Sequence, residues 1–409
     1  MRKPSVSIIF LTVFIDLIGF GIVIPLLPVY ADNFHATGFE IGALGSTFSL
    51  MQFIFAPFLG RLSDRIGRRP VLLTSTAGAA ISYVIFAFGS GLHGRAALLV
   101  LFLSRAFAGL CGANITVAQA YIADITPPAD RSKKMGFIGM AFGLGFIFGP
   151  VLGSLGRKYG DTAPGWIAAS LCAANFLLAL FILPESWKPN SEHAAQRPHM
   201  DQWLHTLSHP KLRLLIGVFF LATFCFTCFE ITLGLMVYKK FHIDPESNWG
   251  KALLGYLFAY AGIVGALVQG GATGRLVKMW GEPKLVAISL FLVAVGLGPM
   301  PFASNWAVLL LLLAVLATGS MLTRPPVFGM ISNLTPAHEQ GATIGVAQSA
   351  GSLARIVGPV FAGTLFYIKP PLPYLICAGV SLLTGILAWQ HLTRNYEVPL
   401  PVSAPKAEA

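Results

Sequence analysis

The chain alternates long apolar stretches with short polar breaks. Each stretch holds about 20 or more mainly apolar residues, enough to cross a bilayer core of about 30 Å. The sequence therefore predicts an all-α integral membrane protein with twelve transmembrane helices. These helices are expected near residues 5–30, 39–60, 70–89, 96–123, 135–156, 166–184, 212–238, 251–272, 284–302, 306–333, 342–367 and 372–393.

One long polar interruption divides the stretches into six plus six. Within it, Trp203, Leu204 and Leu207 are spaced as in a short amphipathic helix that lies on the cytoplasmic surface. The tail after Arg394 is rich in proline and alanine, a composition typical of disorder. The expected organisation is an N-terminal six-helix bundle (1–184), a cytoplasmic linker (185–211), a C-terminal six-helix bundle (212–394) and a disordered tail (395–409).

The second half of the chain repeats features of the first at nearly constant intervals. The frame Gly60-Arg61-Leu62…Gly67 returns as Gly274-Arg275-Leu276…Gly281. Thr126-Pro127 returns as Thr335-Pro336, and Gly149-Pro150 returns as Gly358-Pro359. Duplicated membrane halves are the usual construction of a secondary transporter. The repeats therefore predict two pseudo-symmetric bundles that move a small-molecule substrate.

Composition and charge support a membrane protein and exclude a soluble one. Apolar residues make up 55% of the chain and charged residues 11%, whereas soluble domains carry about 25% charged residues. Most of the 28 lysines and arginines fall at the ends that share a side with the N-terminus. The positive-inside rule then predicts a multi-pass protein of the inner (plasma) membrane with both termini in the cytoplasm. The net charge of +11 is thus a topology signal and does not indicate nucleic acid. Nothing indicates oligomerisation, so we expect a monomer.

Catalytic and metal-binding patterns are not found in the sequence. No Ser-His-Asp set, metal-ligand cluster or phosphate loop is recognisable. The five cysteines all lie in apolar stretches, where small packing residues are the plain interpretation. We therefore expect no enzyme activity, no cofactor and no metal.

The charged loop at residues 60–70 predicts a gate. The Asp64 carboxylate can meet an exposed helix N-terminus, where free backbone N–H groups favour an anion. Arg68 can reach Asp124 and join two helices of the first half. Such contacts can form in one state and break in another, and the expected gating residues are Gly60, Asp64, Arg65, Gly67, Arg68 and Asp124. The alternative is a basic loop that only sets topology.

The fifth apolar stretch carries closely spaced glycines. Small residues at this spacing let helix backbones approach closely, and Pro150 introduces a bend. We expect this helix to pack against a helix of the other half and to seal the periplasmic side; the alternative is ordinary packing. The residues are Gly139, Gly143, Gly145, Gly149, Pro150 and Gly153.

Charged residues inside the apolar stretches are the candidates for proton coupling, because isolated charges in a membrane cost several kcal/mol. Asp16 and Arg105 lie near mid-depth from opposite ends and can pair. Moving this carboxylate towards or away from the arginine would release or bind a proton. The alternative is a permanent structural ion pair. Glu230 has no obvious partner in the sequence and is the second proton candidate.

Other polar residues within the stretches are candidates for binding substrate. Together with Phe and Met they would give an amphipathic pocket, although several must bond the backbone instead. Arg324 and Arg355 have no counterpart in the first half, and two cations against one carboxylate there favour an anionic substrate group. The candidates are Gln52, Asn114, Gln119, Gln269, Arg324, Gln348 and Arg355.

The loop Gly60–Arg69 resembles the signature loop of the major facilitator superfamily. Phe14–Gly21 with the two following prolines resembles the first-helix motif of its drug/proton antiporters, and Leu103-Ser104-Arg105 the fourth-helix arginine motif. The glycines and Pro150 of the fifth stretch resemble the antiporter motif. The resemblance covers nearly the whole chain and is nearest to tetracycline/proton antiporters. It implies that Asp64 meets the start of the eleventh predicted membrane helix, near residue 342. It also implies a proton-coupled exporter of amphipathic compounds, with a metabolite or organic-anion carrier as the alternative.

Overall fold

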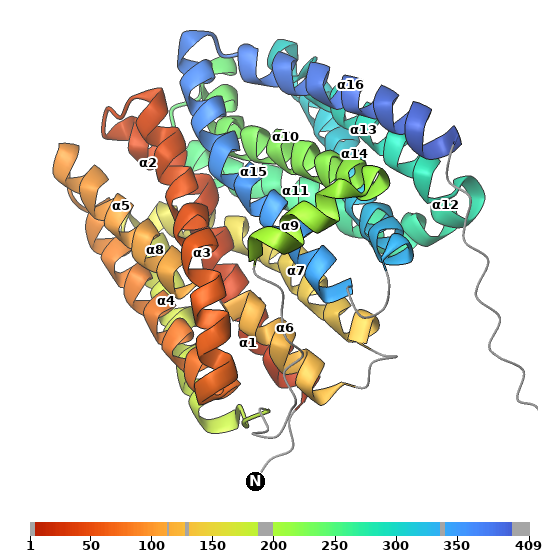
Figure 1. Ribbon diagram of the computed structural model, residues 1–409. Coiled ribbons are helices and arrows are strands. Elements are labelled where there is room, and N and C mark those ends of the chain that lie inside the picture. Colours follow the sequence, from red (N-terminus) through yellow and green to blue (C-terminus); the bar gives the residue numbers. More distant parts are fainter. Residues whose placement is uncertain (1–4, 113, 127–130, 187–198, 336–339, 395–409) are drawn as a thin grey trace, which may run out of the picture.

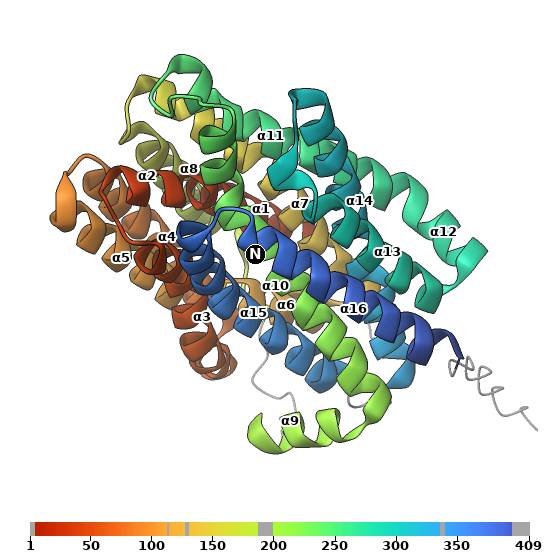
Figure 2. The ribbon, with the colours of Figure 1, turned by 90° about the horizontal axis from the view of Figure 1, so that it is seen from above.

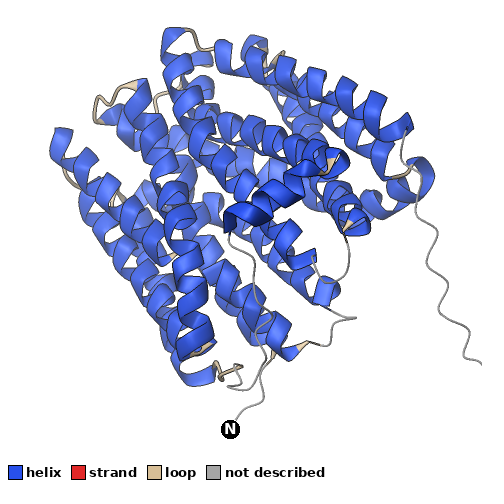
Figure 3. Cartoon of the chain, in the orientation of Figure 1, coloured by secondary structure: helices blue, strands red, loops and turns tan. Residues whose placement is uncertain are grey.

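The structure is a computed structural model that describes residues 5–112, 114–126, 131–186, 199–335 and 340–394. In these ranges every regular element is a helix (Figure 3). There are 12 helical stretches long and apolar enough to cross a membrane, which confirms the predicted fold. The helices are α1 (Val6–Val23), α2 (Leu27–Asn33), α3 (Gly38–Ile66), α4 (Arg68–Ser90), α5 (Gly94–Cys111), α6 (Asn114–Ile125), α7 (Arg131–Gly156), α8 (Ala163–Ile182), α9 (His199–Ser208), α10 (Pro210–Lys240), α11 (Asn248–Leu267), α12 (Thr273–Trp280), α13 (Glu282–Leu297), α14 (Trp306–Leu334), α15 (Gln340–Ile368) and α16 (Leu372–Arg394).

Three of the predicted spans are interrupted rather than continuous. A 3-10 turn at Ile24–Leu26 separates α1 from α2, where Pro25 lacks the N–H that a regular helix would use. The fourth span breaks between α5 and α6, and the Gln52 side chain donates to the freed Gly112 carbonyl at 2.6 Å. A π-helical turn at Val268–Ala272 joins α11 to α12. Such turns are frequent at functional sites.

The helices gather into two groups, which Figures 1 and 2 show from two directions. In the first group α1 packs on α7 and α8, and α4 packs on α5 and α8. In the second, α13 packs on α14 and α16, and α10 packs on α15. The amphipathic helix α9 also joins the second group, because Trp203 and Leu207 pack into its apolar core while Leu204 stays exposed. The exact domain limits remain a prediction, and residues 187–198 and 395–409 lie outside the described part.

Two symmetric contacts join the groups: α7 with α11, and α15 with α3. A Cβ atom placed on Gly255 of α11 would lie 2.9 Å from the Pro150 carbonyl oxygen of α7. A Cβ atom on Gly42 of α3 would likewise collide with the Pro359 carbonyl oxygen of α15. The repeated Gly-Pro pairs thus serve the same purpose in both halves, which is to bring a helix backbone against a glycine of the other half.

The glycine face of α7 differs from its expected packing. Gly145, Gly149 and Gly153 lie against α1 of the same group; a Cβ on Gly149 would come within 2.6 Å of the Gly21 Cα atom. The helix meets the other group through its opposite side, at Ile147, Pro150 and Ser154. Nothing lies within 4 Å of a Cβ on Gly143, and the surroundings of Gly139 lie outside the described part. The helix therefore packs against a helix of the other half, as expected, but its glycine stripe lies against α1 of its own group.

The two ends of the bundle differ in how the groups meet. We call the end with Ile66, Arg68 and Ile125 the terminal face, and the end with Asn33 and Lys240 the far face. Contacts between the groups run from the far face, where Gly38 meets Gly363, to about mid-depth, where Ser46 donates to the Ile356 carbonyl. Nearer the terminal face, α3 turns to its own group, as when Gly60 faces Thr116. The far face is closed, and the groups diverge toward the terminal face (Figure 1).

Candidate functional site

At the terminal face, Arg68 ties three helices of the first group together. Its Nε atom lies 3.1 Å from Asp124 Oδ2 of α6, and its Nη1 donates to Ser63 Oγ of α3 at 2.7 Å. The Ser186 hydroxyl donates to the same Asp124 oxygen at 3.1 Å. The expected contact between Arg68 and Asp124 is therefore present. It forms within one group while the two groups diverge beside it.

Glu185 completes this cluster and was missed in the sequence, where it looked like the first residue of the linker. Its two carboxylate oxygens accept the backbone N–H groups of Arg68 and Arg69 at 2.9 and 3.0 Å. It thus caps the N-terminus of α4, where the helix dipole favours an anion. Gly67 precedes the cap with a φ of 102°, a conformation that glycine adopts readily. The only sequence signal was its position at the end of the sixth span.

The remaining members of the expected gate are less tied down. Arg65 is exposed, and a Cβ on Gly60 would only touch Thr116 at 3.8 Å. The side chain of Asp64 lies outside the described part, as do residues 336–339 before α15, the eleventh membrane span. Their expected contact therefore stays a prediction. The gating role of the whole set is likewise a prediction.

The charged residues of the first group lie among aromatic rings at mid-depth. Arg105 is 1% exposed, and its Cζ atom lies 4.8 Å from the centre of the Phe48 ring and 5.7 Å from that of Phe20. Tyr83 lies within the electrostatic reach of both Arg105 and Asp16. The structure therefore brings Asp16, Tyr83 and Arg105 into one cluster. A direct Asp16–Arg105 pair remains a prediction.

The charged residues of the second group also form one cluster. Arg355 on α15 is attracted by the Glu230 carboxylate on α10 and repelled by Arg324 on α14. Glu230 thus has an electrostatic partner, contrary to the sequence-based interpretation, because α10 and α15 are neighbours although their residues are far apart in the chain. One of its oxygens, Oε1, is buried and has no hydrogen-bond partner among the described residues.

The five amides expected to bind substrate are in different situations. The Gln52 amide already bonds the Gly112 carbonyl, and the side chain of Asn114 lies outside the described part. Gln269 is exposed on the π-helical turn, whereas Gln119 and Gln348 are half-buried. Among the four amides whose side chains are described, Gln119, Gln269 and Gln348 make no recorded side-chain hydrogen bond and are therefore free to contact a ligand.

Cysteines are the remaining candidates for metal ligands. Cys225 and Cys228 of α10 and Cys377 of α16 are buried next to one another, and two of them donate to backbone carbonyls. In the described ranges, no group of three or more His, Cys, Asp and Glu side chains is arranged to hold a metal ion.

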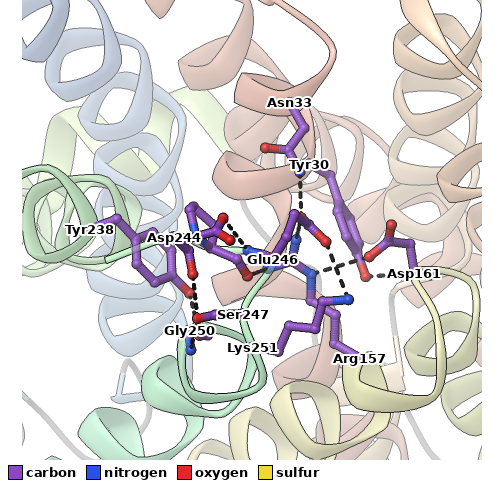
Figure 4. Close-up of polar contacts among 11 residues, drawn as sticks. Tyr30, Asn33, Arg157, Asp161, Tyr238, Asp244, Glu246, Ser247, Gly250 and Lys251 are labelled. Atoms are coloured by element: carbon purple, nitrogen blue, oxygen red, sulfur yellow. Dashed lines mark hydrogen bonds and ion pairs between the residues drawn. The ribbon is translucent and has the colours of Figure 1, made fainter. Parts of the chain in front are cut away.

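A polar network closes the far face (Figure 4). Arg157, which follows α7 in the first group and is fully buried, forms an ion pair with Glu246 of the second group. Its Nη1 donates to the Pro245 carbonyl at 3.2 Å. Asn33 also donates to Glu246, at 3.0 Å. We call the Arg157–Glu246 pair the far-face latch. The sequence analysis did not identify either residue as a functional candidate, because both lie in short loops that have no counterpart in the other half.

Each charge of the far-face latch also has a partner in its own group. Arg157 lies 3.3 Å from Asp161 and 5.4 Å from the centre of the Tyr30 ring. Glu246 lies 3.3 Å from Lys251. Parting the groups therefore strands neither charge, and this avoids most of the penalty for an unpaired buried ion. Each charge would keep a partner of its own group if the groups parted.

Two substitutions at the latch are expected to act in opposite directions. Glu246→Gln weakens the bond between the groups and should raise the population open at the far face roughly tenfold, since a charged hydrogen bond contributes about 1.5–3 kcal/mol. Asp161→Asn removes the partner that Arg157 needs after opening, so it should lower that population. Spin labels at Tyr159→Cys and Lys240→Cys, both exposed, would report the distance distribution. Equal distance distributions in both variants would contradict this role of the far-face latch.

Comparisons with known proteins agree with this architecture. Residues 9–286 and 270–408 match the model of the Major Facilitator Superfamily. The class C tetracycline resistance protein of Escherichia coli is 32% identical, over 98% of this chain and 97% of that protein. Multidrug resistance protein 2 of Bacillus subtilis is 27% identical, over 95% and 96%. The crystal structure of the human organic anion transporter MFSD10 (TETRAN) is similar with a TM-score of 0.70 and 26% identity, over 95% and 100%. The chain therefore belongs to the Major Facilitator Superfamily, a family of membrane transporters rather than enzymes, and is related to drug efflux proteins.

Proposed function

We propose that the protein is a proton-coupled antiporter that exports amphipathic organic compounds by alternating access. The observation that supports the proposal is that each group holds a carboxylate and an arginine within its membrane helices: the charges of Asp16 and Arg105 both act on Tyr83, and the charge of Glu230 acts on Arg355. Each cluster belongs to one of the two helix groups, which are joined at the far face and diverge toward the terminal face. Rocking of two such groups about a central site is how many secondary transporters work.

We further propose that the terminal face is cytoplasmic, that both termini lie inside the cell and that the protein resides in the inner membrane. The basic residues gather at that face, as the positive-inside rule requires. With this orientation, the structure represents a state open to the cytoplasm, from which an exporter loads its substrate. The gate at Arg68 and Asp124 would then close behind the substrate, while the far-face latch opens.

The walls of the proposed pathway suit compounds with aromatic and polar parts. Phe20 and Phe48 surround Arg105 in the first group, and Phe219 and Phe328 lie beside Arg324 in the second. At Arg324, which is exposed, a cation over an aromatic face leaves both apolar ring surface and a hydrogen-bond donor for a ligand. The relatives that are tetracycline and multidrug resistance proteins support this substrate class.

A second candidate is a proton-coupled transporter of a metabolite or organic anion. It is favoured by the two arginines of the second group, which face one carboxylate. The similarity to the human organic anion transporter points in the same direction. The two candidates differ in the direction of coupling and in the charge of the compound.

A transport assay in proteoliposomes tests both candidates. The panel holds tetracycline, a lipophilic cation and an aromatic carboxylate. Vesicles one pH unit more acidic inside should accumulate a substrate of the antiporter about tenfold, since one pH unit is worth about 1.4 kcal/mol per proton. An acidic exterior should drive uptake only by a symporter. Uptake of the carboxylate alone, driven by an acidic exterior, would replace the export proposal with the second candidate. No gradient-driven uptake of any compound would refute both.

A further inference from the structure

Three helices of the second group converge at one aromatic ring. The Arg324 Cζ atom of α14 lies 5.7 Å from the centre of the Phe219 ring of α10, and 5.5 Å from that of Phe328. These two rings pack edge to face with 4.9 Å between their centres. On α15, a Cβ placed on Gly351 would lie 2.7 Å from the same Phe219 ring. Arg355 lies about one turn beyond Gly351 along α15, and its charge interacts with that of Arg324.

The partners of Arg355 leave part of its hydrogen-bonding capacity unused. Its Nη2 donates to Ser352 Oγ at 3.1 Å, and the charge of Glu230 attracts it. A guanidinium has five N–H donors in a planar fork that matches a carboxylate. Glu230 in turn holds a buried oxygen without a hydrogen-bond partner among the described residues. Neither Arg355 nor Glu230 therefore has its hydrogen-bonding capacity filled by the described residues.

The cluster lies where the two groups begin to part. Ile231, the residue after Glu230, reaches across to α3, where a Cβ on Gly45 would lie 2.8 Å from its Cδ1 atom. Arg324 is exposed, whereas Arg105 of the first group is fully buried. The two arginines outnumber the single carboxylate, and they repel each other. An uncompensated cation at this depth is costly, unless an anion from outside the chain joins it.

We propose that Arg324 and Arg355 bind an acidic group of the substrate, a carboxylate or an ionised enol, and that Glu230 competes with it for Arg355. The aromatic part of the substrate would rest against Phe219 and Phe328. This inference rests on the proposed transport function and defines its substrate class. Binding replaces the internal carboxylate by the external one and satisfies both arginine forks at once. A neutral amide of the same shape can offer only one weak acceptor to the same donors.

A matched pair of probes separates charge recognition from apolar binding. The affinities of the purified full-length protein for tritiated 2-naphthylacetate and for its primary amide are measured by equilibrium dialysis. The carboxylate is expected to bind at least about tenfold more tightly than the amide, the usual effect of a desolvated charged bond worth about 1.5–3 kcal/mol. Arg324→Gln and Arg355→Gln should each bring this ratio close to one. Arg355→Lys should keep part of it, because the charge stays while the planar fork is lost.

Glu230→Gln gives a change in the opposite direction. It removes the competing charge without removing volume, so carboxylate binding should tighten severalfold and amide binding should stay constant. Arg275→Gln is the matched control, because Arg275 is an exposed cation of the same group on α12 and should leave the ratio unchanged. Thermal unfolding of each variant shows whether it is folded, and Arg355→Lys replaces Arg355→Gln if the latter is not.

Three results would each overturn the inference. The first is equal affinity for the two probes in the wild-type protein. The second is a carboxylate preference that survives both arginine substitutions, and the third is a carboxylate preference that falls in Glu230→Gln. In each case the transport proposal is judged separately, by pH-driven uptake of the cation or of tetracycline in proteoliposomes. If uptake occurs but the two probes bind equally, the transport proposal holds and the anion site at Arg324 and Arg355 is refuted. If no compound is taken up, the transport proposal itself is refuted.

Discussion

Replacing Arg68 by Ala is expected to reduce transport about tenfold or more while the protein still folds. The substitution removes the ion pair with Asp124 and the bond to Ser63, leaving a half-buried carboxylate without its main cationic partner. Losing a charged hydrogen bond of this kind costs about 1.5–3 kcal/mol, and α3, α4 and α6 would no longer move as one body at the terminal face. The measurement is the initial rate of pH-driven uptake, normalised to protein in the vesicles.

Arg69→Ala is the matched control for this prediction. Arg69 is adjacent and equally charged, but it donates to the carbonyls of Leu183 and Leu180 and does not contact Asp124. It should lower uptake much less. The exchange Arg68→Asp with Asp124→Arg should recover part of the activity, although not all, since Ser63 would lose its donor. A normal rate in Arg68→Ala, or equal losses at both arginines, would rule out a specific gating role for the Arg68–Asp124 pair.

The membrane spans were predictable because each requires a continuous apolar stretch that composition reveals directly. The interruptions within them were harder to see. At the break after Cys111, Gln52 of another helix donates a hydrogen bond to the Gly112 carbonyl, and nothing local in the sequence signals that partner. The glycine stripe of α7 was recognised, but its partner was not. A stripe shows which helix side is smooth, and only the packing of the whole bundle decides which neighbour uses it.

Some residues of the candidate sites were likewise predictable from the sequence, and others were not. Arg68 and Asp124 were found together because the repeated motifs place both at helix ends on one face of the membrane. Glu185 caps α4 across 117 positions, and Arg157 meets Glu246 across 89. These residues lie in short polar segments that follow no period. Glu230 and Arg355 were each recognised as unusual for a membrane helix, yet their association required the knowledge that α10 packs on α15. A charge in an apolar stretch stands out in the sequence because placing it in the membrane costs free energy. Its partner can be identified only once the packing of the helices is known.

Asp16→Asn is expected to abolish proton-driven accumulation while exchange of substrate down its own gradient continues. Asparagine keeps the volume of the side chain near Tyr83 and Arg105, but it cannot bind and release a proton. An inward-acidic gradient of one pH unit should then give an accumulation ratio near one instead of about ten. Counterflow of labelled substrate in the absence of a pH gradient measures the exchange that should persist.

Glu230→Gln and the double variant decide how the coupling is shared between the two groups. If Asp16 carries the proton and Glu230 chiefly competes for Arg355, Glu230→Gln should keep most of the accumulation and the double variant should match Asp16→Asn. If each carboxylate carries a proton, both single variants should lose part of the ratio and the double variant all of it. Glu40→Gln is the matched control: this carboxylate lies at the far end of α3 and forms a capping box with Thr37, a motif that also accepts glutamine. It should accumulate substrate normally. Accumulation that survives in the double variant would show that the protons move through other groups, because no titratable carboxylate of either cluster would remain to carry them.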